Sequence, residues 1–103
     1  MYMHVRGGVI GFEWDEGNLD KNYKKHGIEP KQAEEVFIDS ESIILPDVGH
    51  SQKEDGHIIV GNTLDKQHLF IIFTFRGSRV RIISARKMHK KEVERYEKLK
   101  KNT

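Results

Sequence analysis

The chain has no cysteine among its 103 residues. A disulfide framework and zinc sites built on thiolate ligands are therefore excluded. No apolar run approaches the roughly 20 residues that a membrane-spanning helix needs, and the first 12 residues lack the long apolar region of a signal peptide. We therefore expect a cytoplasmic protein with no membrane partner.

The familiar catalytic signatures are also missing. The chain has no Gly-rich phosphate loop and no G-x-S-x-G elbow, and its acidic residues are too scattered for paired carboxylates to be identified. His50 and His57 bracket Glu54 and Asp55, but this spacing matches no compact metal-ligand motif. With no repeats, low-complexity tracts or long linkers, residues 1–103 predict a single domain without cofactor or metal.

Charge is distributed unevenly along the chain. The net charge is only +2, with 36% hydrophobic and 33% charged residues. Residues 1–75 contain 7 Lys/Arg and 13 Asp/Glu, whereas residues 76–103 contain 11 and 3, so the two parts carry −6 and +8. A basic surface built late in the sequence favours nucleic acid or an acidic protein as partner. The alternative is a solvated final helix with surplus lysines.

Local patterns predict a strand, two helices, four strands and a final helix. Phe12 and Trp14 alternate with Glu13 in a short strand, and Asp15 is a candidate N-cap for a helix over 16–26 that ends at Gly27. Pro30 suits the first turn of a second helix. A strand at 42–45 stops before a polar loop at 47–56, two strands follow at 57–63 and 68–76, and the final helix spans 88–100.

The clearest turn is Gly77-Ser78, which lies between two β-rich runs and predicts a two-residue hairpin. The predicted fold class is therefore α+β. We expect a mainly antiparallel sheet of four to five strands, with two N-terminal helices and one C-terminal helix.

The last strand, "RVRIISARK", combines an aliphatic middle with cationic ends. Strict alternation predicts that one face carries Arg79, Arg81, Ile83, Ala85 and Lys87, and the other Val80, Ile82, Ser84 and Arg86. Arginine is the side chain suited to holding phosphate in a planar, permanently charged fork, and strands place such forks rigidly. The structural alternative is an edge strand protected from aggregation by its charges.

His26 ends the first predicted helix, beside two lysines and just before a glycine. Histidine is the side chain most able to exchange protons near neutral pH. The structural alternative is a hydrogen-bonded core histidine, because Leu19 and Tyr23 share its helical face.

Metal-free phosphodiester chemistry is the catalytic hypothesis that fits these residues. RNA carries its own nucleophile, so an enzyme needs a base for the 2′-hydroxyl proton, fixed cations for the transition state and an acid for the leaving oxygen. Tyr96 is a weaker candidate with a packing role as its alternative. The candidates are His26, Arg76, Arg81, Arg86 and Lys87. A non-catalytic module that binds nucleic acid or an acidic protein on the same surface is the alternative function.

Four segments resemble the BrnT family of bacterial toxins: "FEWDEGNLDKNYKKHGI", "AEEVFID", "FRGSRVRIISARK" and the later "RYE". The resemblance runs from Phe12 to Glu97. It implies a RelE-like fold and a ribonuclease that inhibits translation. It also implies that a BrnA-like ribbon-helix-helix antitoxin neutralises the toxin, and that operator DNA is bound only through this antitoxin. It also directs attention to His26 in K-H-G, Arg76 in F-R-G, and Arg81, Arg86 and Lys87 in R-I-I-S-A-R-K, without assigning their roles.

Overall fold

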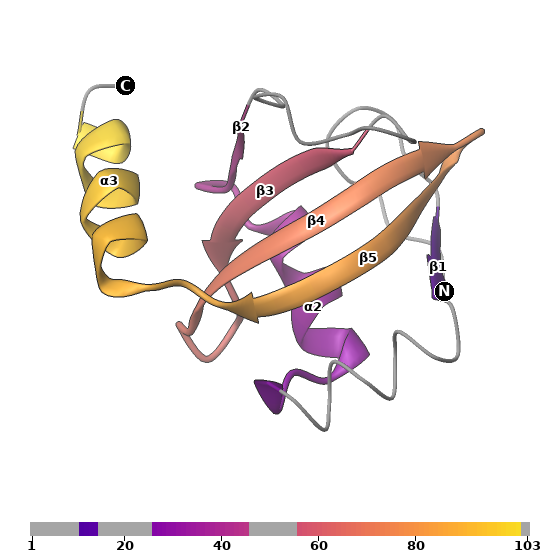
Figure 1. Ribbon diagram of the computed structural model, residues 1–103, viewed down its shortest axis with the longest axis horizontal. Coiled ribbons are helices and arrows are strands. Elements are labelled where there is room, and N and C mark those ends of the chain that lie inside the picture. The colour runs from indigo at the N-terminus through magenta and orange to yellow at the C-terminus, as the bar shows by residue number, and fades with distance from the viewer. Residues whose placement is uncertain (1–10, 15–25, 46–55, 102–103) are drawn as a thin grey trace.

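The computed structural model describes residues 11–14, 26–45 and 56–101. They form five strands and two helices, shown in Figure 1. In chain order these are β1 (Gly11–Trp14), α2 (Pro30–Ile38), β2 (Ile43–Leu45), β3 (His57–Asn62), β4 (His68–Arg76), β5 (Arg79–Lys87) and α3 (Lys90–Lys101). The predicted helix over 16–26 and the loop at 47–56 lie almost wholly outside the described residues.

The five strands form one mixed sheet in the order β1-β5-β4-β3-β2. Strands β2 to β5 pair antiparallel with their sequence neighbours, as expected for a meander. Strand β1 joins the far edge parallel to β5, with Phe12 beside Val80. The predicted α+β class and mainly antiparallel sheet are confirmed, and the fifth strand is the one marked by Phe12 and Trp14.

The turn between β4 and β5 follows the prediction. Gly77 has a φ of +61°, and Ser78 has no positive φ. This combination fits a turn with glycine at the first central position, which continues the natural twist of the two strands. The longest hairpin of the sheet therefore ends in a two-residue turn.

The two helices lie on different sides of the sheet. Figure 1 shows α2 behind the sheet and α3 beyond the end of β5. On the α2 side, Ala33, Val36 and Phe37 pack with the strands in one core cluster. A second cluster joins Val60, Met88 and Tyr96 on the α3 side. Neighbouring residues of a strand point to opposite faces, and Ile59 and Val60 accordingly belong to different clusters.

Local sequence signals explain how α2 is positioned. Pro30 occupies its first turn, and the backbone N–H of Glu29 donates to Gln32 Oε1 at 2.9 Å. Gly61 of β3 lies under the end of this helix, where an added Cβ would come within 2.9 Å of Ser42 Cβ. Glycine thus allows β3 to approach the segment that follows α2.

Candidate functional site

A β-bulge changes the alternation of β5. Ile72 of β4 pairs with Ser84, but the next residue, Phe73, pairs with Ile82, so Ile83 is an extra residue without a partner. Ala85 therefore lies in the same buried cluster as Val80 and Ile82. The face assignment predicted from strict alternation is wrong beyond Ile83, because a bulge inserts one residue and reverses the direction of those that follow.

The bulge brings the arginines of the hairpin to one face. Arg79 pairs with Arg76, Arg81 with Thr74, and Arg86 with Phe70, and the three β4 partners are separated by even numbers of residues. Directly paired residues point to the same side of a sheet. We call the set on this side the arginine face: Arg76, Arg79, Arg81 and Arg86. It is the face on which α3 packs, because Phe70 contacts the Tyr96 cluster.

At the turn end of this face, three arginines form what we call the hairpin cluster: Arg76, Arg79 and Arg81. Arg76 and Arg79 are exposed and stand directly opposite each other. Like charges in this position lower the stability of a hairpin. The carboxylate of Glu13 lies 3.7 Å from Arg79 Nη1 and partly offsets the charge. The cluster is therefore an exposed site of concentrated positive charge, suited to a polyanion.

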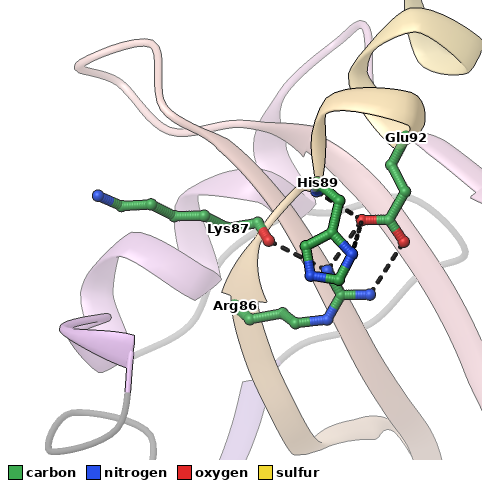
Figure 2. A network of polar contacts seen from close by, with 4 residues as sticks. All are labelled: Arg86, Lys87, His89 and Glu92. Atoms are coloured by element: carbon green, nitrogen blue, oxygen red, sulfur yellow. Dashed lines mark hydrogen bonds and ion pairs between the residues drawn. The ribbon is translucent and has the colours of Figure 1, made fainter.

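At the other end, Arg86 is held in what we call the Arg86 network: Arg86, His89 and Glu92 (Figure 2). Its Nη1 and Nη2 donate to Glu92 Oε1 and Oε2 at 2.8 and 2.9 Å, and the guanidinium lies 4.2 Å from the Phe70 ring centre. This bidentate pair lowers the pKa of Glu92 despite the opposing effect of burial. Arg86 is thus a positioned fork that also fastens β5 to α3.

His89 and Glu92 are site residues that sequence reasoning missed. Glu92 Oε1 accepts the backbone N–H of His89 at 2.7 Å and lies 3.8 Å from the imidazole Nδ1. His89 directly precedes α3, and Glu92 is its third residue. In a capping box, the residue that precedes the helix is followed three positions later by a carboxylate, and His89 and Glu92 have this spacing. That spacing was the only sequence signal for these two residues. It could be used only if the first residue of α3 was already known.

Two predicted site residues lie apart from this face. Lys87 pairs with the buried Leu69, whose side chain belongs to the α2-side cluster, and Figure 2 shows the Lys87 side chain extending away from Arg86. His26 is followed by Gly27 and by Ile28, which packs in the same α2-side cluster. Gly27 has a φ of +68°, as expected for the end of a helix. The contacts shown bring Arg76, Arg81 and Arg86 to one face, but not His26 or Lys87.

Tyr96 has the packing role that was its alternative. Its side chain is buried, its hydroxyl donates to the Glu41 carbonyl at 3.2 Å, and Lys100 Nζ lies 5.0 Å from its ring centre. Burial raises the pKa of Tyr96 to about 12. Such a tyrosine anchors α3 and does not face a substrate.

One small cavity, of about 90 Å³, adjoins the Arg86 network, since Phe70, Glu92 and Tyr96 line it, and two larger cavities lie elsewhere. His57 packs against the rings of Phe73 and Phe75, and the described residues contain no group of three or more potential metal ligands. A cavity of about 650 Å³ lies between Gln32 and Leu64, and another of about 490 Å³ lies between Ile44 and Leu99. Neither is lined by an arginine. No helix in the described part of the chain is long and apolar enough to cross a membrane.

A family model described as "Ribonuclease toxin, BrnT, of type II toxin-antitoxin system" matches residues 14–92. The chain belongs to the BrnT family. The matched region contains the whole hairpin and ends at Glu92, so the arginine face and the Arg86 network both lie within the family's shared region. As a toxin of a type II toxin–antitoxin system, a BrnT protein is a ribonuclease whose substrate is RNA and whose partner is an antitoxin.

A solved structure supports the same fold. The crystal structure at 1.1 Å of the ribonuclease toxin BrnT from Brucella abortus superposes with a TM-score of 0.64 over 80% of this chain and 100% of that chain, at 23% sequence identity. A search of curated proteins finds no significant match.

Proposed function

We propose that this BrnT protein cleaves RNA without a metal ion, using the arginine face to bind the RNA backbone and Arg86 to hold the scissile phosphodiester. The observation that carries the proposal is the convergence of Arg76, Arg81 and Arg86 on one face of a rigid hairpin, made possible by the bulge at Ile83. Guanidinium groups fixed before the reaction stabilise the charge that develops at phosphorus without having to reorganise.

The proposed reaction uses the 2′-hydroxyl of RNA as the nucleophile. Its oxygen attacks the adjacent phosphorus, and the bond from phosphorus to the 5′-oxygen breaks, which leaves a 2′,3′-cyclic phosphate and a 5′-hydroxyl. The reaction needs a base for the 2′-hydroxyl proton, a proton for the leaving 5′-oxygen from the protein or from water, and stabilisation of the anionic transition state. Arginine and histidine side chains are sufficient for these tasks.

The roles of His26 and Lys87 remain predictions. We assign Lys87 an assisting contact to phosphate beyond the arginine face, since it ends the same strand as Arg86. His26 is a candidate for proton transfer. A His26→Ala variant that keeps its fold and full cleavage activity would remove that residue from the reaction.

The antitoxin partner that we propose is a BrnA-like ribbon-helix-helix protein, and we propose that operator DNA is bound only through this antitoxin. We also propose that the toxin has a RelE-like arrangement. The exposed positive charge of the hairpin cluster supports an acidic covering segment. Co-expression with the neighbouring reading frame, followed by purification of a stable complex, tests the pairing. Charge reversal at Arg76 and Arg79 is expected to weaken the complex.

Cleavage by the purified protein is the test of the proposed function. Antitoxin-free protein incubated with RNA and EDTA should give fragments ending in 2′,3′-cyclic or 3′-phosphate. Loss of cleavage on adding EDTA, with recovery on adding a divalent metal, would overturn metal independence. One observation favours a non-catalytic binding module as the second candidate: Arg86 is already paired with Glu92. Binding to several RNAs without any cleavage would favour that candidate.

A further inference from the structure

His89 is an exposed histidine in a structured polar network. Its side chain is 74% exposed, whereas its neighbours Arg86 and Glu92 are 24% and 28% exposed. At the junction of β5 and α3, Glu92 Oε1 lies 3.8 Å from His89 Nδ1 and 2.8 Å from Arg86 Nη1, so the imidazole and the guanidinium share one carboxylate neighbour (Figure 2). A group that exchanges protons is therefore placed at the surface, next to a fixed cation and a fixed anion.

The pairing of Arg86 with Glu92 leaves the fork able to bind a phosphate. The guanidinium makes three hydrogen bonds, two to the Glu92 carboxylate and one from Nη1 to the Lys87 carbonyl at 3.1 Å. A guanidinium has five N–H donors. Two of the five therefore make no hydrogen bond within the described part of the chain, while the other three keep the plane of the fork fixed. Such a group meets a phosphate oxygen without first having to be ordered.

Glu92 is placed to act through His89. Its Oε1 atom lies 3.8 Å from His89 Nδ1 and also accepts the backbone N–H of that residue, which fixes the start of α3. At 3.8 Å the carboxylate makes no hydrogen bond to the ring, but its negative charge lies on the Nδ1 side and attracts the positive charge that develops when Nε2 takes a proton. The arrangement therefore favours a base over an acid at His89, with Nε2 as the nitrogen that meets the substrate.

We propose that His89 is the catalytic base that removes the 2′-hydroxyl proton of RNA, with Arg86 binding the phosphate and Glu92 as a positioning residue. This inference rests on the proposed ribonuclease function. In the step, the 2′-oxygen forms its bond to phosphorus as its proton passes to Nε2 of His89. The bond to the 5′-oxygen breaks, and that oxygen takes a proton from water. The imidazolium returns its proton to solvent after the products leave.

The variants are chosen to separate proton transfer from helix capping. His89→Asn removes the base but supplies a side chain that is favoured before a helix. We expect its free energy of unfolding to equal that of the wild type. Its cleavage of RNA should be at least about 100-fold slower, which is the usual contribution of a general base. The exposed neighbour Lys90 provides the control, and Lys90→Ala is expected to retain wild-type cleavage. His89→Ala should recover part of its rate when free imidazole is added.

A substrate with sulfur in place of the 5′-oxygen distinguishes the base from the acid. Sulfur leaves without protonation, so a variant lacking only the acid would cleave this RNA as fast as the wild type. A variant lacking the base would remain slow, as we expect for His89→Asn. Normal cleavage of ordinary RNA by folded His89→Asn, or wild-type speed on the sulfur substrate, would overturn the inference alone. Failure of the wild type to cleave any RNA would overturn the proposed function together with it.

Discussion

The two ends of the arginine face use the same side chain in opposite ways. The guanidinium of Arg79 belongs to a side chain that is 55% exposed, faces another arginine and has a carboxylate only at 3.7 Å. Arg86 belongs to a side chain that is 24% exposed and holds Glu92 in two short hydrogen bonds. The β4 partners of Arg79 and Arg86 are six residues apart, so the strand rise places the two ends roughly 20 Å apart. The hairpin cluster is suited to attracting a polyanion, whereas the Arg86 network holds one guanidinium in a fixed orientation.

This difference teaches that positive charge alone does not identify the reacting part of the surface. Exposed cations raise the rate and strength of RNA association, and salt screens them. A held fork contributes little to long-range attraction but gives directional hydrogen bonds. We therefore expect substitutions in the hairpin cluster to change binding, and substitutions in the Arg86 network to change the rate of cleavage.

Arg86→Ala is the substitution expected to have the largest effect on the rate of cleavage. Cleavage should fall by about 100- to 1,000-fold, as when one preorganised donor to a transition-state anion is removed. The free energy of unfolding should also fall by about 1–2 kcal/mol, because Glu92 loses its partner in a partly buried position. Single-turnover cleavage and urea denaturation measure the two effects.

A second substitution separates these two effects of Arg86. In Arg86→Ala with Glu92→Gln, the unpaired carboxylate is gone, so stability should recover while cleavage stays low. Arg86→Lys, which keeps the charge without the planar fork, should remain at least about 10-fold slower than the wild type. Full cleavage by any folded variant lacking Arg86 would show that this end of the face is only a structural link to α3.

Arg79→Ala tests the hairpin cluster. We expect the affinity for an RNA with 2′-deoxyribose at the cleavage site to fall by about 3- to 10-fold at low salt, with a salt dependence shallower by about 0.7 per lost phosphate contact. Stability should be unchanged or slightly higher, since one of two opposed arginines is removed. Fluorescence anisotropy over a range of salt concentrations measures both quantities.

Lys98→Ala is the matched control for that experiment. It removes the same charge from an exposed position on α3. The salt dependence should remain close to that of the wild type. Equal effects of the two variants would mean that net charge, and not the position of the hairpin cluster, governs binding.

Tyr96→Phe tests a second attachment of α3, the hydrogen bond from Tyr96 to Glu41, which does not involve Arg86. Losing the hydrogen bond to the Glu41 carbonyl should cost about 1 kcal/mol at neutral pH. Because burial raises the pKa of Tyr96 to about 12 from its ordinary 10.0, the folded state retains the phenolic proton more strongly than the unfolded state. The stability this provides is present below pH 10 and is lost as pH rises toward 12. Denaturation across that interval should show the loss in the wild type and not in Tyr96→Phe.

Much of the fold followed from local patterns in the sequence. Period-two alternation identified β1, glycine at position 77 identified the hairpin, and Pro30 marked the start of α2. These signals depend on a few neighbouring residues, so they are readable in one dimension. The parallel pairing of β1 with β5 is a contact between distant segments, and only the structure gives it.

The site was harder to predict, because it depends on one inserted residue. Nothing in "RVRIISARK" marks Ile83 as the bulge, and without the bulge Arg81 and Arg86 would lie on opposite faces. Once the register is known, Arg86 lies over Phe70 and within reach of Glu92. The residue types were therefore predictable, whereas the convergence of the arginines and the part that we propose for His89 depend on the three-dimensional pairing of the strands.

The smallest expected effect is the acid dependence of the Arg86 network. Hydrogen bonding from Arg86 lowers the pKa of Glu92 below 4.5 in the folded protein, so the pair stabilises the fold above that pH and is lost as pH falls further. We expect a change below about 1 kcal/mol, because the side chains are partly exposed. Thermal unfolding between pH 6 and 3 should show this loss in the wild type, and Glu92→Gln should remove it. Glu13→Gln, at the longer and more exposed pair with Arg79, should leave that loss in place. If Glu13→Gln removed this loss of stability instead, the Glu13–Arg79 pair would contribute more to stability than the Glu92–Arg86 pair.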